Sequence, residues 1–113
     1  MAEKKKTESH KEAYYQTKIL TWLKKTYPEA FVWKANQGPY SNLNGLPDIC
    51  AVIAGHFFGF ECKRPGGKAT KLQETAISRI NSAGGTALVV TTVAEVQEAI
   101  EKALQCDPLS GQG

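Results

Sequence analysis

The 113-residue sequence has no apolar run approaching the roughly 18 residues that a membrane-spanning helix needs. Its first six residues include three consecutive lysines and lack the apolar segment of a secretory signal peptide. The length suits one domain with a core of two or three layers. We therefore expect a single domain over residues 1–113 in the cytoplasm, with flexible tails at residues 1–8 and 106–113.

Cysteine and histidine are also scarce, at three and two residues. No CxxC pair or Cys/His cluster is present, which argues against a structural zinc site. Cys50 and Cys62 are expected on opposite faces of a β-hairpin and Cys106 lies near the C-terminus, so no disulfide is predicted. His10 and His56 are far apart in sequence, and each is interpreted as an ordinary surface or turn residue.

Charge is distributed unevenly along the chain. Residues 1–92 carry 13 basic and 7 acidic side chains, whereas residues 93–113 carry 1 basic and 4 acidic ones. The excess of basic side chains in residues 1–92 favours a polyanion as a binding partner over an acidic protein surface. Since a run of lysines near a terminus is usually just solvated, the charge alone supports nucleic-acid binding only weakly.

Two β-prone runs, residues 48–54 and 57–63, lie on either side of the pair Gly55–His56. A glycine in the first position of a two-residue loop is typical of a type II′ turn, so we predict an antiparallel hairpin with that turn. This register places Cys50 opposite Glu61 and Asp48 opposite Lys63.

The hairpin brings two carboxylates onto one face of the sheet. Directly opposed residues share a face, so Asp48 and Glu61 become diagonal neighbours about 7 Å apart at the backbone. Small side chains at Cys50 and Gly59 are expected to leave that face open. Carboxylates at such range repel by on the order of 2 kcal/mol at an effective dielectric near 20, and a divalent cation would turn this repulsion into affinity.

An alternative is a plain cross-strand ion pair between Asp48 and Lys63, with Glu61 solvated. Pro47 and the apolar residues around both acids instead favour a buried sheet, where carboxylates rarely lie without a purpose.

A helix is predicted from about Ser9 to Thr26, ended by Pro28. Glu12 lies on its apolar stripe near the N-terminus, where an acid is unexpected. Glu12 either interacts with the helix dipole or points a third carboxylate at the sheet.

The remaining elements alternate between strand and helix. A short strand over residues 30–35 precedes a polar loop, residues 36–46, which could touch a phosphate or a base or be a plain connection. After the hairpin, a basic turn over residues 63–68 leads to a helix that opens with a Thr70–Gln73 capping box and ends near Gly84. We expect its inward residues to be Leu72, Ala76, Ile77 and Ile80.

A fully buried strand is predicted over residues 86–91, followed by a Thr92–Glu95 capping box and a final helix to about Leu104. The order αβββαβα predicts an α/β fold with a mixed central sheet flanked by helices on both faces. Gln73 has a sufficient structural role in its cap, or it could orient water or phosphate at a helix N-terminus.

These residues together resemble a known nuclease signature. Pro47 and Asp48, followed on the next strand by Glu61, Cys62 and Lys63, resemble the PD-(D/E)XK motif. The fuller pattern is similar to the virus-type replication-repair nuclease (VRR-NUC) domain over residues 12 to about 100, on Glu12, Gly45–Asp48, Glu61–Gly67 and Gln73.

The resemblance implies a restriction-endonuclease-like core and a metal-dependent DNA endonuclease. Asp48, Glu61 and the backbone carbonyl of Cys62 would bind Mg²⁺, with Mn²⁺ substituting, and Glu12 would complete the shell through water. Lys63 would orient or deprotonate the attacking water and Gln73 would steady the scissile region. The catalytic residues implied are Glu12, Asp48, Glu61, Lys63 and Gln73.

Stand-alone members of the family are similar to Holliday junction resolvases, which implies a homodimer acting on branched DNA in repair, and a bacterial or phage origin. The alternatives are a nuclease of linear duplex DNA and a catalytically silent DNA-binding module. The candidate DNA contacts are Lys34, Asn36, Tyr40, Arg64, Lys68 and Lys71.

Overall fold

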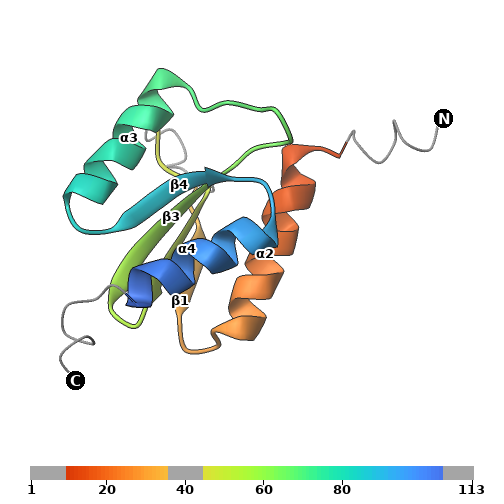
Figure 1. The fold of residues 1–113 in the computed structure, drawn as a ribbon. Coiled ribbons are helices and arrows are strands. Elements are labelled where there is room, and N and C mark those ends of the chain that lie inside the picture. Colours follow the sequence, from red (N-terminus) through yellow and green to blue (C-terminus); the bar gives the residue numbers. More distant parts are fainter. Residues whose placement is uncertain (1–9, 36–44, 106–113) are drawn as a thin grey trace.

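A computed structural model describes residues 10–35 and 45–105 of the chain. It contains the predicted order αβββαβα (Figure 1). The elements are α2 (Glu12–Thr26), β1 (Phe31–Lys34), β2 (Ile49–Ile53), β3 (His56–Cys62), α3 (Lys71–Ser82), β4 (Thr86–Val90) and α4 (Val93–Gln105). The expected tails and most of the 36–46 loop lie outside these residues. Within the described part, no helix is long and apolar enough to cross a membrane.

The strands form one mixed sheet in the order β1-β2-β3-β4. The pairs β1–β2 and β2–β3 are antiparallel, and β4 runs parallel to β3. Helices α2 and α4 cover one face, while α3 packs on the other face against β4 and β3 (Figure 1). The prediction of a mixed sheet with helices on both faces is confirmed.

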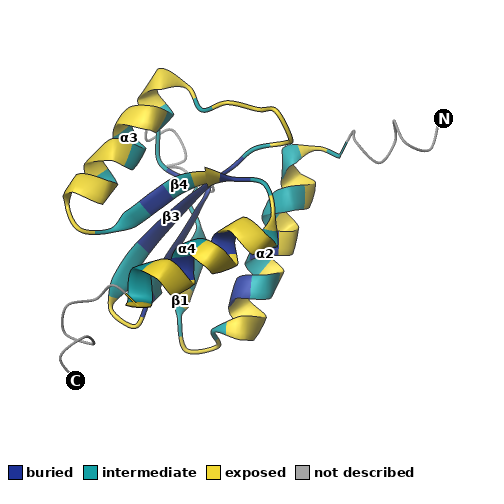
Figure 2. Cartoon of the chain, in the orientation of Figure 1, coloured by how far each residue is buried: buried dark blue, intermediate teal, exposed yellow. Residues whose placement is uncertain are grey.

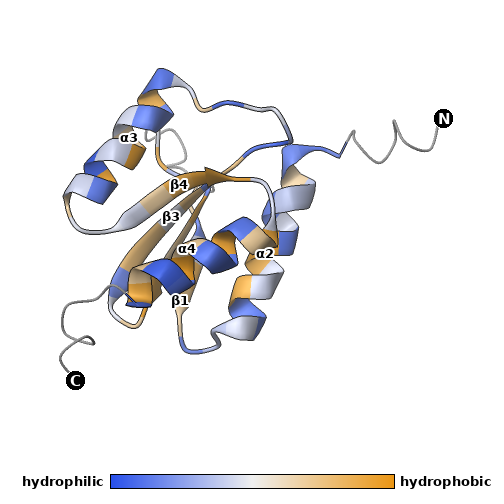
Figure 3. Cartoon of the chain, in the orientation of Figure 1, coloured by the Kyte–Doolittle hydropathy of each residue, from blue (hydrophilic) through white to orange (hydrophobic). Residues whose placement is uncertain are grey.

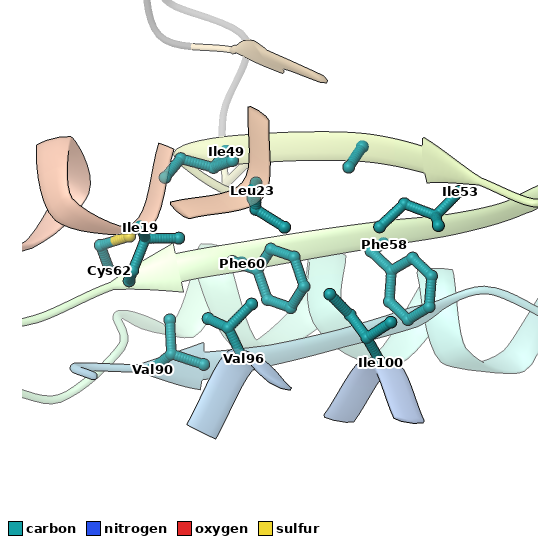
Figure 4. Packing of buried hydrophobic residues seen from close by; sticks show 11 residues of the cluster. Ile19, Leu23, Ile49, Ile53, Phe58, Phe60, Cys62, Val90, Val96 and Ile100 are labelled. Carbon is teal, nitrogen blue, oxygen red and sulfur yellow. The ribbon is translucent and has the colours of Figure 1, made fainter. Parts of the chain in front are cut away.

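The core lies between the sheet and the pair α2 and α4 (Figure 4). Alternate residues of each central strand point into it, as the two-residue repeat of a strand requires. Figure 3 shows the apolar strands as a continuous layer and the helices with mixed polar and apolar bands. The buried members include Ile19, Leu23, Ile49, Ala51, Ile53, Phe58, Phe60, Cys62, Val90, Val96 and Ile100.

The hairpin turn lies one residue earlier than predicted, which shifts the register by two. Ile53 pairs with His56, so the loop is Ala54–Gly55, and both residues have positive φ, at 52° and 82°. Two left-handed residues fit a type I′ turn, which matches the twist of the strands as the predicted type II′ turn would. His56 joins β3, where its Nε2 lies 2.8 Å from Thr86 Oγ1.

In the observed register, Asp48 and Glu61 are directly opposite each other instead of diagonal neighbours. Ile49 pairs with Phe60, so Asp48, one residue before β2, lies opposite Glu61 rather than opposite Lys63. A shift of two residues keeps every side chain on its predicted face, because the strand repeat is two. The prediction that Asp48 and Glu61 share a face of the sheet therefore holds, although the predicted register was wrong.

The expectation that Cys50 and Gly59 leave this face open was wrong. Pro47 packs on Gly59, where an added Cβ would lie 2.7 Å from the proline Cγ, and the Cys50 thiol lies 3.9 Å from the Pro47 carbonyl. Cys50 and Cys62 are free buried thiols on opposite faces, as predicted. Burial raises the pKa of both thiols, to about 11 and about 12.

Helix α3 lies on the outside of the molecule, and Figure 2 shows its surface as largely exposed. Its predicted capping box is present, with Thr70 Oγ1 accepting from the Gln73 N–H at 3.2 Å. None of its residues is fully buried, and the expectation that Leu72 points inward was wrong because this side chain is 58% exposed.

Strand β4 is an edge strand in the described sheet rather than a fully buried one, and Val89 is 37% exposed. Only Ala87 and Val90 of its five residues are buried. The side chain of Asn81 covers part of the edge, since its Nδ2 donates to the Ala87 carbonyl at 2.9 Å and its Oδ1 accepts from the Ala87 N–H at 2.8 Å. The side-chain amide of Asn81 thus makes the two hydrogen bonds that a neighbouring strand would otherwise make with the Ala87 backbone.

Candidate active site

Two buried carboxylates lie at one end of the sheet, where β2 begins and β3 ends. Asp48 is 7% exposed and Glu61 is 1% exposed. Asp48 is held by the backbone, because its Oδ2 accepts a hydrogen bond from the Cys62 N–H at 3.0 Å. Its own carbonyl accepts from the Ala35 N–H at 2.9 Å, which ties the entry of β2 to the end of β1.

Glu61 is the least satisfied polar side chain of this site. Its Oε1 is buried and has no hydrogen-bond partner among the residues that the structure describes. Burial, and then the neighbouring charge of Asp48, raise the pKa of the Glu61 carboxyl from 4.5 to about 7. A buried carboxylate oxygen without a donor is costly, so this atom is the strongest indication of a missing cationic partner.

Gln73 reaches the same carboxylate from α3. Its Nε2 donates to Glu61 Oε2 at 2.8 Å, while its Oε1 accepts from the Thr70 N–H at 2.8 Å. Gln73 thus caps α3 and contacts Glu61 with the same side chain, and its role in orienting water or phosphate stays a prediction.

Lys63 lies between two acids. Its Nζ is 3.6 Å from Glu61 Oε2 and 3.9 Å from Glu12 Oε2, and its side chain is 13% exposed. The Lys63 N–H donates to the Val90 carbonyl at 2.9 Å. The Lys63 backbone is therefore tied to the end of β4 just before the chain leaves the sheet.

Glu12 comes from the first turn of α2, and its side chain is 43% exposed. Two roles were left open for Glu12, an interaction with the helix dipole and a carboxylate directed at the sheet, and its contact with Lys63 favours the second. A pocket of about 350 Å³ lies beside it, lined by Glu12, Arg64, Pro65, Gly66 and Gly67. Of the candidate site residues, Glu12 and Arg64 line this pocket, whereas the buried acids Asp48 and Glu61 do not.

Within the described residues, no group of three His, Cys, Asp or Glu side chains is arranged to hold a metal ion. The site instead offers two buried carboxylates, Asp48 and Glu61, with the Cys62 backbone between Glu61 and Lys63. Mg²⁺ prefers oxygen ligands, is often bound through only one or two carboxylates and keeps several waters. The donor set and the unpaired Glu61 Oε1 fit such an ion.

The candidate DNA contacts divide into three groups. Arg64, Lys68 and Lys71 are exposed, on the turn after β3 and the start of α3. Lys34 is partly buried on the core-facing side of β1, close enough to lower the pKa of the Cys62 thiol, though burial dominates that group. Asn36 and Tyr40 lie outside the described residues.

Thr91 is a site-supporting residue that the sequence analysis missed. Its Oγ1 donates to the Lys63 carbonyl at 2.8 Å, and its N–H donates to Glu95 Oε1 at 2.7 Å. Glu95 also completes the predicted capping box with Thr92. No sequence signal marks Thr91, because the contact joins residues 28 positions apart.

No family model matches the sequence, and no curated protein matches it. The structure is similar to a solved VRR_NUC domain, with a TM-score of 0.59 and 21% sequence identity, over 77% of this chain and 95% of that chain. At this identity the likeness establishes the fold. It confirms the prediction that the chain has the restriction-endonuclease-like core of a VRR-NUC domain.

Proposed function

We propose that this chain is a Mg²⁺-dependent DNA endonuclease, with Mn²⁺ able to substitute, that hydrolyses phosphodiester bonds in branched DNA such as four-way junctions. The observation that carries the proposal is the buried Oε1 of Glu61, which lies beside Asp48 and Lys63 and has no hydrogen-bond partner within residues 10–35 and 45–105. The VRR-NUC fold supports the same activity.

The proposed ion would be held by Asp48, Glu61 and the main-chain carbonyl of Cys62, with Glu12 acting through water. When bound, Mg²⁺ stabilises negative charge on phosphate oxygens and lowers the pKa of a coordinated water. Hydrogen bonds from Cys62 N–H and Gln73 Nε2 hold the two carboxylates before the ion arrives. This preorganisation reduces the reorganisation needed on binding.

Lys63 would act at the phosphate through its Nζ. The ammonium lies among carboxylates and is largely shielded from solvent, so it can hold a proton beside the attacking water and offset charge that develops on the phosphate. The exposed cations Arg64, Lys68 and Lys71 would contact the backbone of the DNA on either side.

We further propose that two copies act together, because resolving a four-way junction requires paired cuts on two strands. The test is incubation with labelled junction, flap and linear duplex DNA in Mg²⁺, Mn²⁺ or EDTA. Cleavage of the junction in either metal and none in EDTA is expected, with slower cutting of duplex arms.

Lys63→Ala should abolish cleavage but leave DNA affinity within a few fold, because many cations share the phosphate contacts. Lys24→Ala, on an exposed position in the last turn of α2, is the matched control and should cut normally. Equal rates for Lys63→Ala and the wild type would remove Lys63 from the mechanism. DNA binding by the wild type without cleavage in either metal would instead identify a silent DNA-binding module.

A further inference from the structure

Three aromatic rings form a column at the N-terminal end of α2, outside the hydrophobic core. We define this aromatic column as His10, Tyr14 and Tyr15. The rings of His10 and Tyr14 are stacked, with centroids 3.8 Å apart and planes inclined by 11°. The Tyr15 ring lies edge-on to both, with its centroid 5.1 Å from that of Tyr14 and 6.3 Å from that of His10. Within the described residues, none of the three belongs to the core cluster, so packing of the core does not account for the column.

Tyr14 is the most accessible ring of the column. Its side chain is 40% exposed, whereas His10 and Tyr15 are partly buried. Lys18, one turn further along α2, places its Nζ 3.4 Å from the Tyr14 hydroxyl and 5.1 Å from the ring centroid. Because the ammonium is nearer to the hydroxyl than to the ring centre, it lies toward the edge of the ring. The exposed part of Tyr14 therefore offers a flat aromatic surface with a cation at its edge.

The column lies next to the candidate active site. Glu12, two residues before Tyr14, has its Oε2 3.9 Å from Lys63 Nζ. Glu12 also lines a pocket with Arg64, and Figure 1 shows the first turn of α2 beside the loop that follows β3. Residues two apart lie on opposite sides of a helical turn, so Glu12 and Tyr14 are separated by about one helix diameter, ~10–12 Å. At about 3.4 Å per nucleotide of a strand, this separation corresponds to roughly three nucleotides.

The charge of α2 is complementary to a nucleic acid strand. Residues 10–26 contain four lysines, all of them exposed, and a single acid, Glu12. Exposed rings accompanied by cations are typical of surfaces that bind single strands, because the cations contact phosphates while a base stacks on the ring. A base inside a duplex is stacked on its neighbours on both faces, so Tyr14 can accept only an unpaired or terminal base.

The column could instead serve only to stabilise the start of α2, where the N-cap residue Lys11 makes no side-chain capping hydrogen bond. Contacts between side chains four residues apart, such as Tyr14 and Lys18, stabilise helices in general. This structural role would be retained by an apolar side chain of similar size at position 14. Base stacking needs a ring, so the two roles can be separated by experiment.

We propose that Tyr14, supported by His10 and Tyr15, is a stacking platform for an unpaired base of the DNA substrate, with Lys18 contacting an adjacent phosphate. This inference rests on the proposed function, because the strand held by Tyr14 would be one whose phosphate lies at Lys63. The platform gives the chain a means of preferring DNA with unpaired bases near the cut, such as a flap or an opened junction, over plain duplex.

The test is equilibrium binding of the full chain in EDTA to a duplex with a flap of unpaired thymines and to the same duplex without the flap, measured by fluorescence anisotropy. Tyr14→Leu should weaken flap binding about tenfold and change duplex binding by less than about twofold. Tyr14→Phe keeps the ring and should bind both DNAs as the wild type does. Thr17→Ala, at an exposed position of the same helix, is the control and should change neither affinity.

Circular dichroism checks that Tyr14→Leu is folded. If it is not, the wild type is tested alone by photocrosslinking to a flap that contains an iodouracil base, and mass spectrometry should identify Tyr14 as the crosslinked residue. Flap binding by Tyr14→Leu equal to that of the wild type would overturn the inference, as would an equal loss on both DNAs or a crosslink that does not include Tyr14.

The binding measurement does not depend on cleavage. A wild type that selects the flap through Tyr14 but cuts no DNA would contradict the proposed function and leave the platform standing. A chain that cuts junctions, and whose Tyr14→Leu variant binds the flap normally, would support the proposed function and overturn the platform.

Discussion

Gln73 and Glu61 are joined by a hydrogen bond of 2.8 Å that links a helix cap to a buried carboxylate. The same glutamine accepts the Thr70 N–H, which fixes which end of its amide faces the acid. Because the Gln73 Oε1 accepts the Thr70 N–H, the Nε2 of the same amide points toward Glu61. The N-terminus of α3 therefore positions the candidate site directly.

The change Gln73→Glu should separate the two roles of this residue. Glutamate keeps the capping box, since its oxygen can still accept from Thr70. At pH 8 the substituting carboxylate would repel ionised Glu61 and lower the free energy of unfolding by about 1–3 kcal/mol. At pH 5 Glu61 is protonated and can donate, so the loss should largely disappear.

Urea unfolding at both pH values in EDTA measures this difference. Thr70→Ala removes the cap alone and should cost about 1 kcal/mol at both pH values. Equal destabilisation of Gln73→Glu at pH 5 and pH 8 would mean that Gln73 does not sense the charge of Glu61.

The raised pKa of Glu61 predicts a stability that falls with pH in the metal-free protein. A folded-state pKa of about 7 against 4.5 means that the folded chain binds more protons than the unfolded chain. The free energy of unfolding should therefore decrease between about pH 4.5 and 7 and level off above, by on the order of 3 kcal/mol. Glu61→Gln should remove this slope and be more stable than the wild type at pH 8.

Urea unfolding from pH 5 to pH 8 in EDTA checks the slope, with exposed Glu98→Gln on α4 as the control. Millimolar Mg²⁺ should then stabilise the wild type at pH 8 but not Glu61→Gln, because a ligand stabilises only the state that binds it. A wild-type stability that does not change across this range would contradict the assignment.

Thr91→Val should slow cleavage without weakening DNA binding. The substitution keeps the side-chain shape but removes the donor to the Lys63 carbonyl. A net hydrogen bond of about 1 kcal/mol corresponds to a roughly fivefold loss in rate if it is felt only in the transition state. Single-turnover kinetics should show this loss in the rate constant, with DNA affinity within twofold.

Thr91→Ser retains the hydroxyl and should restore the rate. If the serine variant is as slow as the valine variant, the methyl group rather than the hydrogen bond matters. Unfolding measured on the same samples separates this effect from a general loss of folded protein.

The common face of Asp48 and Glu61 could be predicted because strand side chains alternate with a period of two. Moving the turn from Gly55–His56 to Ala54–Gly55 changed the partner of every residue but not its face. Local patterns also located the capping boxes, which depend on residues three apart. The shared face of Asp48 and Glu61 was thus predictable, but their direct opposition in the strand pairing was not.

The errors concern contacts between distant segments. Leu72 fits the helical stripe of α3, yet no element covers that part of the helix in the described structure. Pro47 fills the space above Gly59, although nothing in the two-residue spacing of the strand indicates a covering loop. Contacts between distant segments determine whether a residue such as Leu72 or Gly59 is covered, and the local pattern of a single sequence does not indicate those contacts.

The clamp of Asn81 on Ala87 predicts a local weakness at the β4 edge. Asn81→Ala would leave the Ala87 N–H and carbonyl without their partners and should lower the free energy of unfolding by about 1–3 kcal/mol. Hydrogen exchange should show faster exchange at the Ala87 amide, while the core amide of Phe60 changes only as global stability changes. Ser82→Ala, at the next position, which is also exposed, is the control and should alter neither measurement. An Ala87 amide that stays protected in Asn81→Ala would show that another group covers the edge, because an open edge strand exchanges with solvent on local opening alone.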